Sequence, residues 1–436
     1  MRTLRMELRR TMIALAVLAC LATGSRTEEQ SANVRDKAQK LNAITGMNPL
    51  RGEVKALLDD KAKTDSRKLV SEAVRLAKDK PQSFSYNATL ILATTAAGLK
   101  DYSAAETFYR LHRDQAKQLS SVHGLITAYN GLVITLIGAK KYAEAEKICE
   151  EALEHQIIGG MLLRLRRDND ADSEEERKPI ERFRTLMVQE QILAIAYQDD
   201  SDRAVEVIDK LFKEPASNWL ALDLKGRVYR IVGKNEQAVK TYEDELERIQ
   251  KDKKLSKEDK ESLIADTRYS LSGVYVEANQ IDKAAEQLKT LLEKEPDNPT
   301  YNNDLGYIWA DHDMNLTESE KLIRKAIEEE RKQRRKDNPK LKPEEDKDNA
   351  AHLDSLGWVL YKQKKYQDAK KYLRQAVEQE DGQHIEILDH LGDVLIALGE
   401  KAEAVAVWKK SVETPGDSKR EQKRKEGVLK KIKANE

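Results

Sequence analysis

One pattern of large and small residues recurs along most of the chain, and this repetition narrows the folds that the chain can adopt. The clearest copies are residues 129–152, 353–376 and 388–411. Each copy has a leucine, a small residue 13 positions later and an apolar residue four positions after that. This spacing indicates two antiparallel helices that cross where small side chains allow their backbones to approach closely.

A single helix pair cannot bury its apolar face alone, so neighbouring pairs are expected to stack around one continuous core. The composition agrees with an all-helical chain, because only 5% of the 436 residues are aromatic and only 19 are glycine. A mean hydropathy of −0.72 argues against a protein with many membrane-spanning helices. The 77 basic and 77 acidic residues balance, and we therefore expect no binding to nucleic acid.

The pattern resembles the tetratricopeptide repeat, a helix–turn–helix unit of about 34 residues. In the last copy, Leu391 and Gly392 match the leucine–glycine pair of the family's first helix. Ala404 and Trp408 match the small and large positions of its second helix. We expect about eight units, which start near residues 86, 126, 185, 219, 265, 299, 350 and 385. The resemblance implies an all-α fold, a right-handed superhelical solenoid whose first helices line a concave groove.

The remaining segments are expected to flank or interrupt this array, which spans residues 86–418. Residues 25–85 show helical spacing of apolar residues and predict an N-terminal helical cap that includes a partly degenerate repeat. Residues 419–436 carry Val428 and Ile432 among basic residues and predict a C-terminal capping helix. Three charged insertions, which we interpret as lengthened helices and solvated loops, lie at 157–178, 247–260 and 331–349.

Residues 1–24 have the features of a secretory signal peptide. Four arginines precede an apolar run at residues 11–22, and small residues end that run. We expect cleavage after Gly24 and export to the periplasm or cell envelope. Two alternatives stay open, a buried first helix and a lipoprotein assembly factor anchored through Cys20. Attachment to a membrane is expected only if Cys20 is lipidated.

The sequence offers no motif for catalysis or for binding a cofactor. It has no cysteine or histidine pairs with metal-ligand spacing, no phosphate-binding glycine loop and no nucleophile elbow. Cys149 falls on an apolar helix face and is expected to be a core residue. We therefore predict a protein–protein interaction scaffold or adaptor of the bacterial cell envelope, without enzymatic activity, cofactor or metal. The alternative is a regulatory or docking subunit of an envelope enzyme, in which the array docks a separate enzyme or the insertion at 157–178 builds a site that is not visible as a motif.

The resemblance also implies which residues face the groove. Positions that contact ligands in the family correspond here to Asn303, Asp304, Tyr307, Asp354, Ser355, Trp358, Tyr361, Asp389, His390 and Asp393. Several carboxylates beside aromatic rings attract cationic side chains. We therefore expect the partners to be proteins or peptide segments with basic character. The other interpretation is that Trp358 packs against a neighbouring helix and the acids only solvate the surface.

Overall fold

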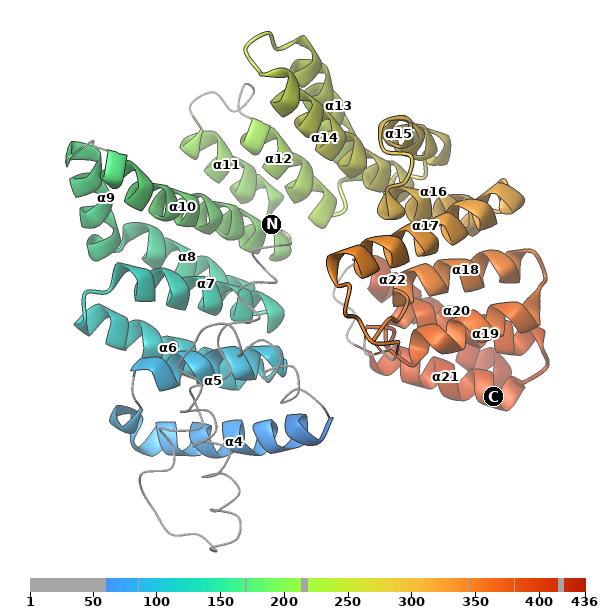
Figure 1. The fold of residues 1–436 in the computed structure, drawn as a ribbon, viewed down its shortest axis with the longest axis horizontal. Helices are drawn as coiled ribbons and strands as arrows, with labels where there is room; N and C mark the ends of the chain where they lie inside the picture. Colours follow the sequence, from blue (N-terminus) through green and yellow to red (C-terminus); the bar gives the residue numbers. More distant parts are fainter. Residues whose placement is uncertain are drawn as a thin grey trace, which may run out of the picture. The chain divides into compact units, whose positions relative to one another are not determined.

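Antiparallel α-helices account for the fold (Figure 1). The computed structural model describes residues 60–84, 86–168, 171–212, 219–343, 345–379, 381–414 and 419–436. These ranges contain nineteen α-helices and no strand, which confirms the predicted all-α fold. The chain divides into two compact units, unit 1 (Met1–Val207) and unit 2 (Ile208–Glu436), and each is described by itself.

Two of the predicted segments fall partly or wholly outside these ranges. The predicted signal peptide, residues 1–24, and residues 25–59 of the predicted N-terminal cap lie outside the described residues. Among the helices that are described, none combines the length and the apolar character needed to cross a membrane.

Unit 1 is a stack of helices joined by short turns (Figure 1). Its elements are α4 (Asp60–Asp79), the short 3₁₀ helix η2 (Pro81–Ser83), α5 (Tyr86–Gly98), α6 (Tyr102–Gln118), α7 (Val122–Gly138), α8 (Tyr142–Glu154), α9 (Gln156–Asp168) and α10 (Ala171–Tyr197), and α11 (Ser201–Leu211) crosses its boundary. Local signals fix where helices begin. At the start of α6, for example, the Asp101 side chain accepts a hydrogen bond from the backbone N–H of Ala104.

The prediction for the insertion at 157–178 was wrong in part, because this segment belongs to the core of unit 1. It forms α9 and the start of α10. Ile158, Leu162 and Leu165 of α9 are buried in the same apolar cluster as α4 to α8. Their spacing of four and three residues places them on one face of α9, which packs against α7 and α10. Charged residues such as Arg164 lie on the opposite, exposed face.

Unit 2 continues the pattern with five helix pairs and a final single helix. The pairs are α12 (Trp219–Ile231) with α13 (Asn235–Lys251), α14 (Lys257–Glu277) with α15 (Ile281–Lys294), α16 (Pro299–Asp311) with α17 (Leu316–Asp337), α18 (Ala350–Lys362) with α19 (Tyr366–Val377), and α20 (Ile385–Ala397) with α21 (Lys401–Glu413). We call the earlier member of each pair its first helix. The final helix is α22 (Lys419–Asn435).

Packing at the helix crossings explains the repeated small residues. Gly392 lies on α20 where the indole of Trp408 comes across from α21, and a Cβ atom at this glycine would lie 2.1 Å from the indole nitrogen. Ala404 on α21 is fully buried at the same crossing. The small residues therefore leave the space that the large residue fills, which produces the close packing of a protein interior.

Three first helices begin earlier than the repeat pattern predicts. The units expected from residues 126, 185 and 265 start with α7 at Val122, α10 at Ala171 and α14 at Lys257. Ser121 and Ser256 cap two of these helices, since each side-chain oxygen accepts a hydrogen bond from the backbone N–H three residues later. The repeat pattern starts at the first large residue of each unit. It therefore does not indicate the capping residues that precede that position.

The insertions at 247–260 and 331–349 are lengthened helices followed by loops. α13 and α14 take up most of the first insertion, and α17 continues through the second as far as Asp337. The following loop is tied back to α17, because Arg334 and Asp346 form an ion pair with a nitrogen–oxygen distance of 2.7 Å.

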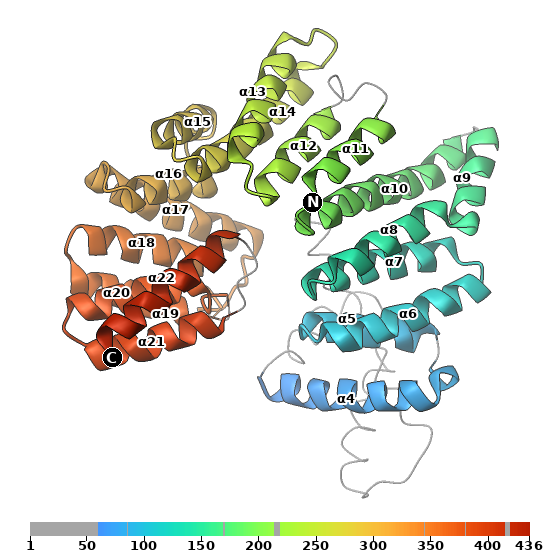
Figure 2. The same ribbon diagram turned by 180° about the vertical axis from the view of Figure 1, so that it is seen from behind.

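The C-terminal helix α22 lies against α20 and α21 (Figure 2). Val428 is fully buried there and Ile432 is 7% exposed, so both side chains cover the apolar end of the stack. The next residue after Val428, Leu429, is half exposed on the other side of the helix. Helix α22 thus has one apolar contact line, and most of its other side chains are charged.

Candidate functional site

The ten predicted groove residues lie on three successive first helices of unit 2, α16, α18 and α20. The structure places them at very different depths. Asn303, Asp354, Ser355, Trp358, Asp389 and His390 are buried, while Asp304, Tyr307, Tyr361 and Asp393 are half-buried. We call the side of unit 2 that these residues share its inner surface. Their predicted role in binding a partner stays a prediction.

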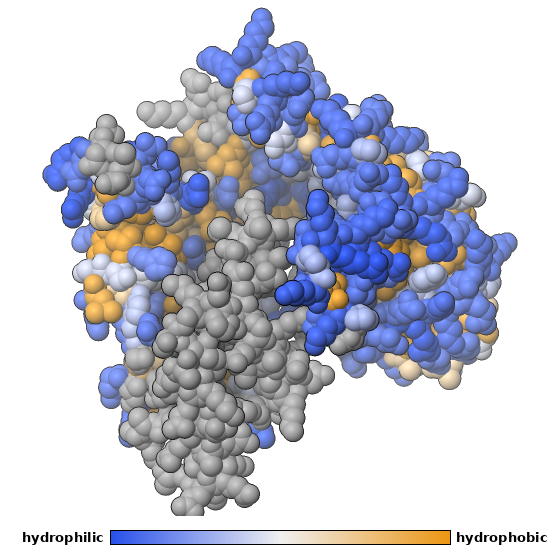
Figure 3. Space-filling model, in the orientation of Figure 1, coloured by the Kyte–Doolittle hydropathy of each residue, from blue (hydrophilic) through white to orange (hydrophobic). Residues whose placement is uncertain are grey.

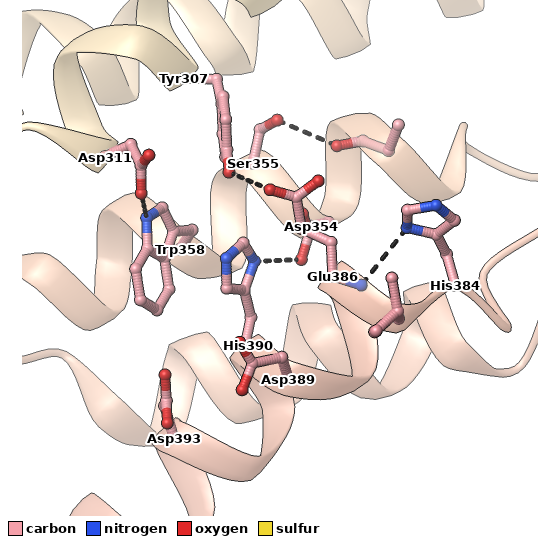
Figure 4. A network of polar contacts seen from close by, with 12 residues as sticks. Tyr307, Asp311, Asp354, Ser355, Trp358, His384, Glu386, Asp389, His390 and Asp393 are labelled. Atoms are coloured by element: carbon pink, nitrogen blue, oxygen red, sulfur yellow. Dashed lines mark hydrogen bonds and ion pairs between the residues drawn. The ribbon is translucent and has the colours of Figure 1, made fainter. Parts of the chain in front are cut away.

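Trp358 joins all three helices. Its ring stacks on the imidazole of His390 with a centroid distance of 4.0 Å, and on Tyr361 with a centroid distance of 5.0 Å. The indole nitrogen donates a hydrogen bond of 3.0 Å to Asp311 at the end of α16 (Figure 4). The side chain is 8% exposed, so Trp358 packs against neighbouring helices. This is the arrangement that the second interpretation of the sequence anticipated for the indole.

His390 and Asp354 form a buried pair between α18 and α20. The Nδ1 atom of His390 lies 2.9 Å from the Asp354 carboxylate, and the imidazole is 1% exposed (Figure 4). Burial lowers the pKa of His390, but the charges of Asp354 and Glu386 outweigh that effect and leave the pKa above its ordinary value. The pair therefore favours a protonated imidazole inside the helix stack.

Glu386, at the start of α20, collects contacts from α16 and α22. Its carboxylate accepts hydrogen bonds from the Tyr307 hydroxyl at 2.7 Å, from Arg420 at 2.8 Å and from Arg424 at 2.5 Å. Burial acts to raise the pKa of Glu386, but Arg424 and Arg420 overcome this and lower it to about 2. Glu386 is thus held as a carboxylate at the meeting point of three helices.

Two further carboxylates of α20 are neutralised by α22. Lys431 donates to both Asp389 and Asp393 at 2.7 Å, and Arg424 donates to Asp389 at 3.2 Å. Burial raises the pKa of Asp393 in spite of the nearby Lys431 charge. We call Glu386, Asp389 and Asp393 the carboxylate row of α20. Their spacing of three and four residues places all three side chains on one helix face.

Comparison with known proteins shows which family has this architecture. Two sequence models described as tetratricopeptide repeat match the chain, one at residues 125–154 and 349–378 and the other at residues 271–334. The chain contains tetratricopeptide repeats. The family predicted from the leucine–glycine and alanine spacing is therefore confirmed.

Other tetratricopeptide repeat proteins are similar to parts or most of the chain. The TPR repeat-containing protein PA4667 of Pseudomonas aeruginosa is 34% identical over 125 residues, a match that covers 29% of this chain and 18% of that relative's length. A solved tetratricopeptide repeat protein from Parabacteroides merdae has a TM-score of 0.42 and 12% identity, covering 70% of this chain and 98% of its own. Yeast Tom70 has a TM-score of 0.43 and 15% identity, covering 97% and 95%.

In this tetratricopeptide repeat protein, two predicted groove residues lie apart from the carboxylate row. Asn303 donates to Asp304 at 3.2 Å, and Asp304 also accepts a 2.9 Å hydrogen bond from Tyr269 on α14. A third, Ser355, is satisfied locally, because its hydroxyl donates to the backbone carbonyl of Ala351. The prediction therefore combined residues of two neighbouring polar clusters.

Sequence reasoning missed Glu386 and the basic residues of α22 that meet it. Arg420 and Arg424 are four residues apart and Lys431 follows seven residues later, so these side chains share one face of a helix. That spacing, together with the apolar Val428 beside it, was the signal that could have indicated a helix docked on an acidic surface.

The surface of unit 1 has a different chemistry. Ile134 on α7 is 53% exposed, and Tyr197 at the end of α10 is 45% exposed and stacks on Tyr142 with a centroid distance of 4.9 Å. Apolar side chains reach the surface of unit 1 around α8 to α10, whereas the C-terminal helix pairs present a mostly hydrophilic face (Figure 3). The two units thus offer surfaces of contrasting polarity.

The described side chains differ in the chemistry that they can support. No group of three or more histidine, cysteine, aspartate or glutamate side chains among them is placed to hold a metal ion. Cys149 is fully buried, and burial raises the pKa of its thiol above the ordinary value, as is typical of an unreactive core cysteine. Carboxylates that already face arginine and lysine are suited to recognising cations.

Proposed function

We propose that this protein is a non-catalytic scaffold or adaptor of the cell envelope, which binds partner proteins or peptide segments on the first-helix side of its repeats. One observation carries the proposal: unit 1 exposes apolar side chains around α8 to α10, whereas the first helix α20 of unit 2 carries a row of carboxylates. Two surfaces of different chemistry on one chain suit a protein that brings different partners together.

Crosslinking from defined positions tests this role. A photo-reactive phenylalanine analogue would replace Ile134 in unit 1 and, separately, Tyr269 in unit 2, because both side chains are at least 40% exposed on first helices. Lys332 on the second helix α17 is the control position, with a side chain 58% exposed. We expect discrete protein adducts from the two first-helix positions and none from the control. Identical adducts from all three positions, or no adducts, would contradict the proposal.

The cell-envelope setting rests on the N-terminal sequence. If residues 1–24 are a signal peptide, intact-mass analysis of protein from its native host will find Ser25 as the first residue. A mature chain that starts at an acylated Cys20 would instead support the lipoprotein alternative. Recovery of an intact Met1 would remove the basis for export.

A further inference from the structure

Helix α22 contacts unit 2 through two halves of different chemistry. Its second half buries Val428 and Ile432 against the end of the helix stack. Its first half carries Arg420 and Arg424, which both reach the carboxylate of Glu386. The apolar half explains how the last repeat is covered, but the arginines contribute nothing to that cover.

The two arginines lie on a surface built by three successive repeats. The Glu386 carboxylate that they contact also accepts the hydroxyl of Tyr307 from α16. Arg424 lies 3.5 Å from His390, whose other ring nitrogen bonds to Asp354 on α18. Figure 4 shows Tyr307, Asp354, Glu386 and His390 converging from these helices. The first half of α22 therefore lies where a ligand of the inner surface would lie.

The two arginines differ in their access to water. The Arg420 side chain is 55% exposed and that of Arg424 is 20% exposed, while the Glu386 side chain is 21% exposed. The ion pair of Arg420 has enough access to water to be screened by salt, whereas the ion pair between Arg424 and Glu386 is mostly buried. The contact of Arg420 is therefore the one that a separate segment would displace first, without unfolding of the whole domain.

We propose that Glu386 and Asp389, the first two carboxylates of the carboxylate row of α20, form a docking surface for a basic helical segment of a partner protein, and that Arg420 and Arg424 of α22 occupy this surface within the same chain. The inference rests on the proposed scaffold function and names the partner's chemistry. The occupant itself defines that chemistry: two arginines four residues apart on a helix, so that both guanidinium groups reach one carboxylate. Because the occupant is tethered, its high local concentration weakens binding of a separate segment.

A competition experiment on the full chain tests the proposal. The probe is a fluorescein-labelled peptide with the sequence of residues 417–427, and its binding is followed by fluorescence anisotropy. The double variant Arg420→Gln, Arg424→Gln removes the two arginines from Glu386, and keeps Lys431 and the apolar half of α22 in place. We expect this variant to bind the peptide about tenfold more tightly than the natural chain does, and added salt to weaken the binding.

Matched controls separate specific docking from net charge. The double variant Lys423→Gln, Lys430→Gln makes the same charge change on exposed positions of α22 and should leave peptide affinity unchanged. Adding Glu386→Gln to the arginine variant should abolish the gain. Equal affinity of the natural chain and the arginine variant, or an equal gain in the lysine control, would overturn the proposal.

Further readouts cover the other outcomes. If the double variant melts far below the natural chain, the single variant Arg420→Gln, which alters the more exposed arginine, replaces it in the same assay. Light scattering tests whether a second copy of the chain occupies the surface. A dimer that the added peptide dissociates would assign the surface to self-association and overturn the assignment to a partner protein. Failure of peptide binding would leave the crosslinking result of the proposed function intact, so the two hypotheses fail separately.

Discussion

Glu245 in α13 is an acid held almost entirely out of water. Its side chain is 3% exposed, and its Oε2 atom has no hydrogen-bond partner among the described residues. Burial, with a smaller contribution from the negative charge of Asp223, raises the pKa of Glu245 to about 8. At neutral pH the folded chain therefore keeps this carboxyl protonated, whereas the unfolded chain ionises it.

The sign of the resulting pH dependence follows from proton linkage. Because the folded pKa lies above the ordinary 4.5, the unfolded state gains stability as pH rises from 4.5 to about 8. We predict that Glu245→Gln, which cannot ionise, stabilises the fold at pH 7 by up to about 3 kcal/mol. Urea titrations at several pH values between 5 and 9 measure the free energy of unfolding. In the natural chain this free energy should decline as pH rises, and in the variant most of that decline should be absent.

Glu247 provides the matched control on the same helix. Its side chain is 61% exposed, so Glu247→Gln should change the free energy of unfolding by less than about 0.5 kcal/mol at every pH. A Glu245→Gln variant with the same pH slope as the natural chain would show that Glu245 ionises freely in the folded state.

The small residue at each helix crossing supports a second prediction at this scale. Ala404 is fully buried beside Trp408, whereas Ala402 on the same helix is exposed. Ala404→Leu should lower the free energy of unfolding by about 1–3 kcal/mol, because extra methyl groups overpack a tight crossing. Ala402→Leu should leave it within about 0.5 kcal/mol. Equal effects of the two substitutions in denaturant titrations would refute the repeat register.

At the scale of elements, helix α9 shows which feature of the fold could not be predicted from the sequence. Leu356 and Ala369 fit a spacing that recurs, so their helix pair could be predicted from the pattern alone. Ile158, Leu162 and Leu165 lie on one helix face too, but their segment has no counterpart in the other repeats. Its burial depends on contacts with α7 and α10. A local pattern predicts such a helix face, but not the surface that covers it.

The same limit applies to the candidate site. Helix spacing correctly placed Asp354, Asp389 and Asp393 on first helices, since four- and three-residue steps define a face. Their burial could not be predicted, because α22 covers two of them and the His390 ring covers the third. Those are contacts between residues more than 30 positions apart in the sequence, which periodicity does not encode.

Adjacent leucines in α9 test whether this helix belongs to the core. Leu162 is 6% exposed and Leu163 is 69% exposed. Leu162→Ala should destabilise unit 1 by about 2–4 kcal/mol, through lost burial and a residual cavity. Leu163→Ala removes the same atoms from the opposite face and should change stability by less than about 0.5 kcal/mol. Circular dichroism measures the urea midpoint of each variant. Equal midpoints for the two variants would show that α9 is not part of the core of unit 1.

At the scale of the whole molecule, the stability of stacked repeats is approximately a sum of local terms. Each repeat contacts mainly its neighbours, so a substitution weakens nearby repeats more than distant ones. The division of the chain into two compact units gives this expectation a measurable form. All four tryptophans, Trp219, Trp309, Trp358 and Trp408, belong to unit 2. Tryptophan fluorescence therefore reports on unit 2, whereas circular dichroism reports on the helices of both units.

The last prediction uses this difference between the two probes. Leu162→Ala in unit 1 should shift the urea transition seen by circular dichroism and leave the fluorescence transition nearly in place. Ala404→Leu in unit 2 should shift the fluorescence transition, because Trp408 packs at the altered crossing. Non-coincident transitions are the signature of unfolding that is not two-state. If each substitution moved both transitions equally, the two units would unfold as one cooperative structure. The stability of the chain would then not be a sum of separate terms for unit 1 and unit 2.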